Sequence, residues 1–207
     1  MNKIVFIAFG VLMGLAGSAQ ADTLFQVLVN TSTISGTNGS LDFQFNYGVG
    51  ETQAATVQIV NFTGGAFTGS PSKSGEVTGG NLPATTTIGN GYTTKSGLDD
   101  YFQGFTFGTS LKFTLDFSGP AVTSPNGAST GNSVFTFSMF SDPNGVDPVL
   151  TNNPNGYAAL ITVNPNGSFT SSAVSPNVNF VPEPSSWLLL SSGAGLLTLA
   201  RRKRHQR

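Results

Sequence analysis

The 207-residue chain contains no cysteine, and its single histidine, His205, lies close to the C-terminal end. Every arginine is also confined to the last seven residues. An ordinary zinc site needs cysteine or histidine ligands, and a Ser-His-Asp or Cys-His nucleophile needs histidine. No glycine-rich loop joins a strand to a helix, so a phosphate cradle is missing too. The body of the chain therefore lacks the groups for most hydrolytic, metal-dependent or phosphate chemistry, and no disulfide can stabilise it.

Positive charge is scarce as well. Residues 22–180 hold nine acidic side chains against Lys73, Lys95 and Lys112, a formal charge of −6. Proteins that bind nucleic acid neutralise phosphates with a basic face. We therefore predict no nucleic-acid partner.

The first 21 residues, MNKIVFIAFGVLMGLAGSAQA, have the pattern of a secretory signal peptide. One lysine precedes an apolar run, and the small residues Ala19 and Ala21 follow it. We predict that signal peptidase cleaves between Ala21 and Asp22. A retained N-terminal helix is the alternative, but the apolar run is short for a membrane span.

Residues 22–180 form the predicted domain, and their pattern is that of β-strands. The segment LDFQFNY at 41–47 places Leu, Phe, Phe and Tyr on one face, and LKFTLDF at 111–117 and VFTFSM at 134–139 repeat this alternation. Fifteen of the seventeen phenylalanines lie in this domain, enough to fill the space between two sheets. We predict an all-β fold without amphipathic helices, an antiparallel β-sandwich of which a jelly roll is one form. The further strands are expected at 24–30, 55–62, 102–107, 157–163 and 172–180.

Turns are marked by Pro-Asn-Gly, which occurs at 125–127, 143–145, 154–156 and 165–167. Proline presets φ at the first turn position, asparagine tolerates the next, and glycine accepts a positive φ. The stretch 64–97 is rich in Gly, Ser and Thr. It is predicted to be a long loop with one or two short edge strands.

The C-terminal segment, residues 181–207, combines an apolar stretch with a basic end. Residues 187–200 carry no charge, and as a helix they would span roughly 21 Å of a hydrocarbon core of roughly 30 Å. Basic flanks remain on the cytoplasmic side of a membrane. We therefore predict a single transmembrane helix, with the β domain on the side of the membrane away from the cytoplasm. The basic stop-transfer sequence consists of Arg201, Arg202, Lys203 and Arg204.

The order of these features resembles a PEP-CTERM sorting signal, the substrate of an exosortase. The resemblance rests on Val181, Pro182, Glu183 and Pro184, followed by the short apolar stretch and the basic end. It implies a Gram-negative host, often one that makes exopolysaccharide. A membrane-embedded cysteine protease would cleave near the motif and release the domain to the cell surface or the medium. An uncleaved single-pass protein is the alternative, and no LPxTG precedes the apolar stretch to suggest wall sorting.

The segments SLDFQFN, IVNFTGG and DYFQGFTFGTSLKFTLDFSG are also similar to a β domain found in uncharacterised PEP-CTERM proteins. That resemblance implies no activity.

Acidic side chains are the remaining candidates for chemistry. Asp99 and Asp100 are adjacent, so on a strand they would point to opposite faces, and each would need a distant partner for glycoside hydrolysis. Asp42 and Asp116 occupy outward strand positions and are expected to be solvated. In SDPNGVDP, oxygen ligands from Asp142, Asn144 and Asp147 could bind calcium, but capping of a Pro-Asn-Gly turn is the favoured role of Asp142. We therefore predict no enzyme, no cofactor and no metal, with calcium as the one weak candidate.

Three functions remain, all for an exported protein that contacts the inner membrane transiently. The first is a structural protein of the cell surface or extracellular matrix, associated with biofilm or exopolysaccharide. The second is a carbohydrate-binding module, for which some of Tyr47, Tyr92, Tyr101 and Tyr157 near strand ends could stack on sugars, although the only Trp, Trp187, lies in the C-terminal segment. The third is a glycoside hydrolase. We predict the first.

Overall fold

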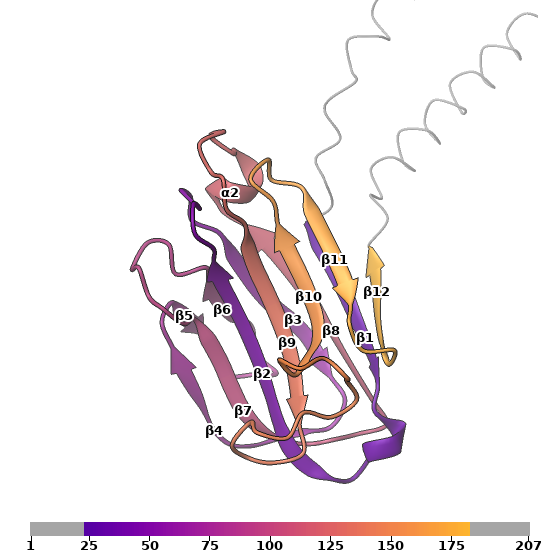
Figure 1. The fold of residues 1–207 in the computed structure, drawn as a ribbon. Coiled ribbons are helices and arrows are strands. Elements are labelled where there is room, and N and C mark those ends of the chain that lie inside the picture. Colours follow the sequence, from indigo (N-terminus) through magenta and orange to yellow (C-terminus); the bar gives the residue numbers. More distant parts are fainter. Residues whose placement is uncertain (1–22, 183–207) are drawn as a thin grey trace, which may run out of the picture.

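The computed structural model describes residues 23–182, and these residues form two packed antiparallel sheets (Figure 1). Sheet A has the strand order β12-β1-β8-β3-β6-β5, and sheet B has the order β11-β10-β9-β2-β7-β4. Within residues 23–182, helix is limited to two short turns, η1 (Ser32–Ile34) and α2 (Pro120–Thr123). The predicted all-β sandwich is confirmed.

Each predicted strand from 24–30 to 157–163 overlaps a strand of the structure. Sheet A consists of β12 (Val178–Pro182), β1 (Leu24–Asn30), β8 (Ser110–Ser118), β3 (Thr56–Thr63), β6 (Thr86–Gly89) and β5 (Val77–Gly79). Sheet B consists of β11 (Phe169–Ala173), β10 (Tyr157–Val163), β9 (Ser133–Phe140), β2 (Asn38–Tyr47), β7 (Asp100–Thr106) and β4 (Ala66–Ser74).

The pairing of the first eight strands follows a jelly roll. Strand β1 pairs with β8, β2 with β7 and β3 with β6, as in a long hairpin that is folded over on itself. Strand β5 departs from the pattern, because it pairs with β6 in sheet A rather than with β4. The later strands β9, β10 and β11 then extend sheet B beyond β2, and β12 extends sheet A beyond β1.

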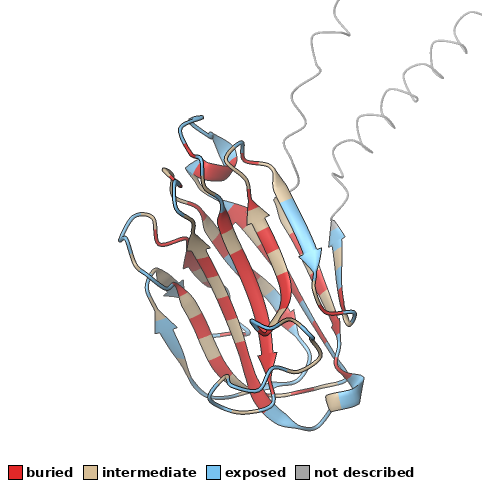
Figure 2. Ribbon diagram, viewed as in Figure 1, coloured by how far each residue is buried: buried red, intermediate tan, exposed pale blue. Residues whose placement is uncertain are grey.

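Phenylalanine side chains from both sheets fill the core. Phe43 of sheet B lies with its ring centroid 5.5 Å from that of Phe113 in sheet A and 5.0 Å from that of Phe137 in its own sheet. Along β2, Leu41, Phe43 and Phe45 are buried and alternate with half-buried residues, whereas β9 is buried at nearly every position (Figure 2). Edge-to-face pairs such as Phe43 with Phe113 add to the hydrophobic gain of burial.

The prediction over 64–97 holds in part: β4 and β5 are edge strands, as expected, but the stretch is not mainly a loop, because it also contributes the interior strand β6. Strand β4 is an edge strand whose side chains are mostly exposed, so burial imposes no alternating pattern on it. Its pairing with β7 depends on backbone hydrogen bonds that the sequence pattern does not show.

The single strand predicted at 172–180 is also wrong. The chain forms β11 in sheet B, turns at residues 174–177, and crosses to β12 in sheet A. Pro176 lies in this turn, consistent with the rule that proline interrupts a ladder of strand hydrogen bonds. The turn is held by the backbone N–H groups of Val174 and Ser175, which both donate to the carbonyl oxygen of Ala158.

Three of the four Pro-Asn-Gly segments are turns, as predicted, whereas the one at 125–127 is irregular with a bend at its glycine. The glycines of all four segments have φ between +72° and +77°, the left-handed region that other residues rarely adopt. The four positions are Gly127, Gly145, Gly156 and Gly167.

Candidate functional site

The two ends of the described chain lie side by side. Strands β1 and β12 are antiparallel neighbours, with Phe25 opposite Pro182 and Gln26 opposite Val181. The predicted signal-peptidase residues Ala19, Ala21 and Asp22 lie outside the described residues, a short distance in sequence before β1. In sequence, one predicted processing point precedes β1 and the other begins at the end of β12, and these two strands are neighbours (Figure 1).

The predicted sorting motif begins inside the fold. Val181 and Pro182 are the last residues of β12, which is an edge strand, and edges are where sheets tolerate proline. The side chain of Val181 is 41% exposed. The rest of the sorting segment lies outside the described residues: Glu183, Pro184, the predicted helix at 187–200, and Arg201, Arg202, Lys203 and Arg204. Over residues 23–182, no helix is both long enough and apolar enough to cross a membrane.

A second candidate site lies on the outer face of sheet B. Strand register places Phe102, Asp42, Ser138 and Tyr157 in one row across β7, β2, β9 and β10. Neighbouring strands lie about 4.8 Å apart, so the row crosses the sheet at right angles to its strands. It combines a carboxylate, a hydroxyl group and two aromatic rings.

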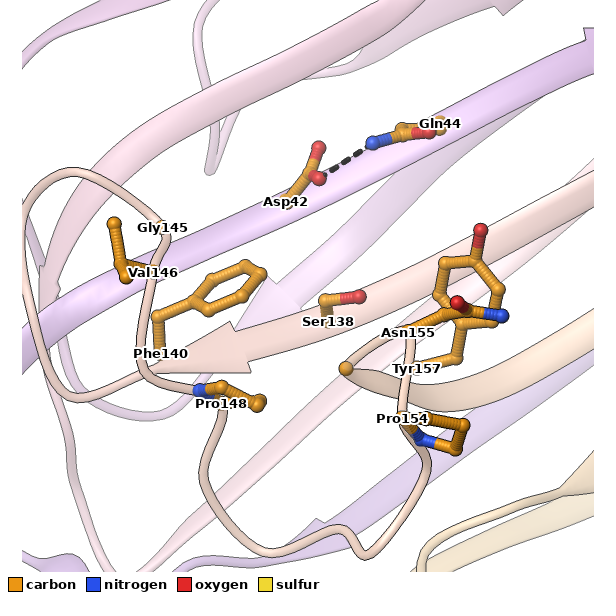
Figure 3. Close-up of a pocket in the computed structure, with 11 residues that line it drawn as sticks. Asp42, Gln44, Ser138, Phe140, Gly145, Val146, Pro148, Pro154, Asn155 and Tyr157 are labelled. Atoms are coloured by element: carbon orange, nitrogen blue, oxygen red, sulfur yellow. Dashed lines mark hydrogen bonds between the residues drawn. The ribbon is translucent and has the colours of Figure 1, made fainter.

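The loop of residues 141–156 folds over this row and turns it into a cleft of about 320 Å³, called here the outer cleft. Figure 3 shows Asp42 and Gln44 side by side on β2, with Ser138 between them and Tyr157. Pro148 and Pro154 from the loop also line the cleft. The cleft is of the size that small ligands and single sugar units occupy in proteins.

Asp42 is the chemically unusual group of the outer cleft. Its Oδ2 accepts a 2.7 Å hydrogen bond from Nε2 of Gln44, whereas its buried Oδ1 has no partner among the described residues. Burial raises the pKa of Asp42 from 3.8 to about 6, the bond from Gln44 opposes this rise, and the charge of Asp100 adds to it. The expectation that Asp42 is solvated is wrong, because the loop between β9 and β10 covers it.

Asp100 lies next to Asp42 on the same face. It is opposite Gln44 in the register of β7 with β2, so the two carboxyl groups occupy diagonal positions on neighbouring strands. Burial also raises the pKa of Asp100, a hydrogen bond from Ser74 opposes the rise, and the charge of Asp99 adds to it. Asp100 does not line the outer cleft.

Asp99, the neighbour of Asp100 in sequence, and Glu51 hold local structure together through hydrogen bonds. Asp99 is buried and accepts hydrogen bonds from Ser96 Oγ and from the backbone N–H of Glu76. Glu51 accepts from the backbone N–H groups of Thr52 and Gln53. Sequence analysis could not predict that Asp42 and Asp100 are neighbours, since only strand register brings them together.

Asp142 caps its own turn. Its two carboxylate oxygens accept from the backbone N–H groups of Asn144, Val146 and Asp147, at 2.7, 2.9 and 2.8 Å. These bonds, above all the one from Asp147, lower the pKa of Asp142. Within residues 23–182, no cluster of three or more His, Cys, Asp or Glu side chains could hold a metal ion.

The four tyrosines have different surroundings. Tyr101 is fully buried, and its hydroxyl oxygen accepts from the backbone N–H of Leu82. Tyr47 and Tyr92 pack edge to face beneath Lys95, whose Nζ lies 3.2 Å from the centre of the Tyr92 ring. Tyr157 is the tyrosine that lines the outer cleft.

Comparison with known families identifies the C-terminal segment. Residues 180–204 match the PEP-CTERM protein-sorting motif. This motif marks an exported protein that an exosortase sorts to the surface of a Gram-negative bacterium, and the predicted resemblance is confirmed. No curated protein and no solved structure matches the chain.

Proposed function

Because the chain carries a PEP-CTERM sorting motif, we propose that it is a structural protein of the extracellular matrix, associated with biofilm or exopolysaccharide. Signal peptidase removes residues 1–21 as the chain crosses the inner membrane, and exosortase cleaves near Val181–Pro184. The observation that carries this proposal is the position of the motif. It starts at the end of β12, so cleavage after it releases the whole sandwich.

The character of the domain supports a structural role. Its charged side chains are few, its loops are rich in Gly, Ser, Thr and Asn, and residues 22–180 contain no histidine or cysteine. Stability comes from a large aromatic core rather than from disulfides or metals. Such a domain needs no cofactor and no particular redox state outside the cell.

The first experiment measures the intact mass of the protein recovered outside the host cells. The expected mass lacks both residues 1–21 and the segment after the Pro-Glu-Pro motif, and any excess would report attached glycan. A mass that still includes RRKRHQR would overturn the sorting step.

The matrix role is tested separately in cells that lack the protein. We expect these cells to lose more polysaccharide on washing than cells that express it. An unchanged matrix, despite normal release of the protein in the parent strain, would overturn the structural role alone.

Carbohydrate binding is the second candidate function, and the outer cleft favours it. A carboxylate, an amide and a hydroxyl group converge there beside Tyr157. Hydrolysis is not proposed, because it needs two carboxyl groups flanking one bond and Asp42 is the only carboxylate among the residues that line the cleft.

A further inference from the structure

We propose that the outer cleft binds a neutral glycan, with Asp42 accepting hydrogen bonds from sugar hydroxyl groups and Tyr157 contacting a sugar ring. This inference rests on the proposed function in one respect: it takes the ligand to be the polysaccharide of the host. It assigns the binding to a particular face of sheet B and to particular side chains.

The unsatisfied oxygen of Asp42 is the first argument for a ligand. A buried acceptor without a donor costs about 1–3 kcal/mol, and Oδ1 of Asp42 is such an acceptor. Gln44 orients the carboxyl group by donating to the other oxygen, Oδ2. Oδ1 has almost no exposed surface, so a hydroxyl donor in the cleft reaches it only if the groups that cover it move; Oδ1 of Asp100 on β7 is buried without a partner in the same way.

The charges around the cleft determine the class of ligand. None of its lining residues is a lysine, and the domain as a whole is acidic, so an anionic ligand would meet repulsion without a compensating cation. Lys73 and Lys95 are engaged elsewhere, Lys73 with the carbonyl oxygens of Gly79 and Gly80 and Lys95 with the tyrosine pair. Calcium takes six to eight oxygen ligands, whereas the cleft offers one carboxylate. A neutral hydroxylated molecule fits best.

The shape of the cleft agrees with a sugar ring. Ser138 stands between Asp42 and Tyr157 in the same cross-strand row and can donate or accept. Two of the three prolines of the loop, Pro148 and Pro154, line the cleft with rigid apolar rings. At the far end of the row, Gly145 packs on Phe102 so closely that an added Cβ would lie 3.0 Å from the ring. The ligand is therefore expected over Asp42, Ser138 and Tyr157 rather than over Phe102.

The test is affinity electrophoresis of the full chain, in a zwitterionic detergent without a sugar headgroup. Polysaccharide from the host is separated by anion exchange into a neutral and an acidic fraction, and each is cast into native gels. We expect the neutral fraction to retard the protein. In Asp42→Asn the apparent affinity should fall at least about tenfold, since a hydrogen bond to a charged acceptor is lost.

The logic of Asp42→Asn depends on Gln44. Because Gln44 donates to Oδ2, the new amide must turn its oxygen towards Gln44 and place its NH₂ where Oδ1 was, replacing an acceptor by a donor. Asp116→Asn is the matched control, since Asp116 also lies on an outward strand position, on β8 of sheet A. Tyr157→Phe should retain most of the binding, whereas Tyr157→Ser should lose it.

Three outcomes would overturn the assignment. One is equal retardation of Asp42→Asn and the unaltered protein, and another is the absence of retardation by the neutral fraction. The third is retardation that requires added calcium and is lost in Asp42→Asn, which would identify the cleft as a metal site. Because this assay uses purified protein, its result is independent of sorting. If cells release the protein but it does not bind the neutral fraction, the assignment of glycan binding to the cleft is refuted. If the protein binds but cells do not release it, the sorting step is refuted.

Discussion

Replacing Asp42 by asparagine should stabilise the fold at neutral pH. The folded-state pKa of Asp42 is about 6, against an ordinary value of 3.8. The folded state therefore binds a proton at Asp42 more tightly than the unfolded state does. Protonation of Asp42 thus stabilises the fold; this stabilisation is fully present below pH 3.8 and is lost as the pH rises through about 6. At about 1.4 kcal/mol for each pKa unit, the ionised group costs up to about 3 kcal/mol above pH 7. Asparagine keeps the shape and removes that cost.

The assay is thermal unfolding of the full chain between pH 3 and pH 8. For a domain of this size, about 3 kcal/mol corresponds to a rise in Tm of about 6–12 °C. We expect a rise approaching that range in Asp42→Asn at pH 8 and almost none at pH 3. Asp116→Asn should change Tm less, because Asp116, whose pKa burial also raises, is the more exposed of the two groups. A Tm increase in Asp42→Asn of the same size at every pH, or a decrease at pH 8, would refute the reasoning. A gain in stability together with a loss of glycan binding in Asp42→Asn is the pattern expected when a residue serves function at the expense of stability.

Three more predictions concern the aromatic core, the turn capped by Asp142 and the edge strand β12. Phe113→Ala should lower the free energy of unfolding by about 3–5 kcal/mol in denaturant titrations, since the Phe113 ring packs on Phe43 and Phe137 between the sheets; a loss below about 1 kcal/mol would contradict this packing. Asp142→Ala should make the loop of residues 141–148 more sensitive to protease than in the unaltered protein at pH 7 but not at pH 2. The reason is that the turn needs the ionised carboxylate, whose pKa is lowered. Equal sensitivity of both proteins at pH 7 would refute this. A Gly-Ser spacer inserted after Pro182 should speed the release of the domain in pulse-chase experiments, because β12 then need not leave β1; an unchanged rate would mean that β12 does not restrict the protease.

Strands with a buried face were predictable from the sequence. The alternation in 41–47, 111–117 and 134–139 reflects a physical requirement, since each second side chain must enter the core. Strands β4 and β5 carry no such signal, because most of their side chains remain exposed and their pairing relies on the backbone. Periodicity therefore misses exposed edge strands, and it also misses β6, an interior strand of only four residues.

The candidate site was only partly predictable, for a related reason. The sorting motif is local in sequence, so a few adjacent residues identify it. The outer cleft depends on three strand pairings and on a loop that returns across them. Asp42 alternates with core residues, as a solvated residue would, and nothing near it in sequence shows that residues 141–156 cover it. The low content of basic residues was the useful signal, because it argued against a nucleic-acid partner in advance.

The position of β12 at the edge of sheet A determines how the protease could reach the sorting motif. Strand β12 is joined to its sheet only through β1, over the five pairs from Phe25 with Pro182 to Val29 with Val178. Because β1 also pairs with β8, β12 can separate without breaking the rest of sheet A. A protease that needs Val181 and Pro182 extended and free can therefore obtain them by opening one edge strand. After cleavage beyond the motif the same residues can pair with β1 again, so the released domain keeps both sheets complete.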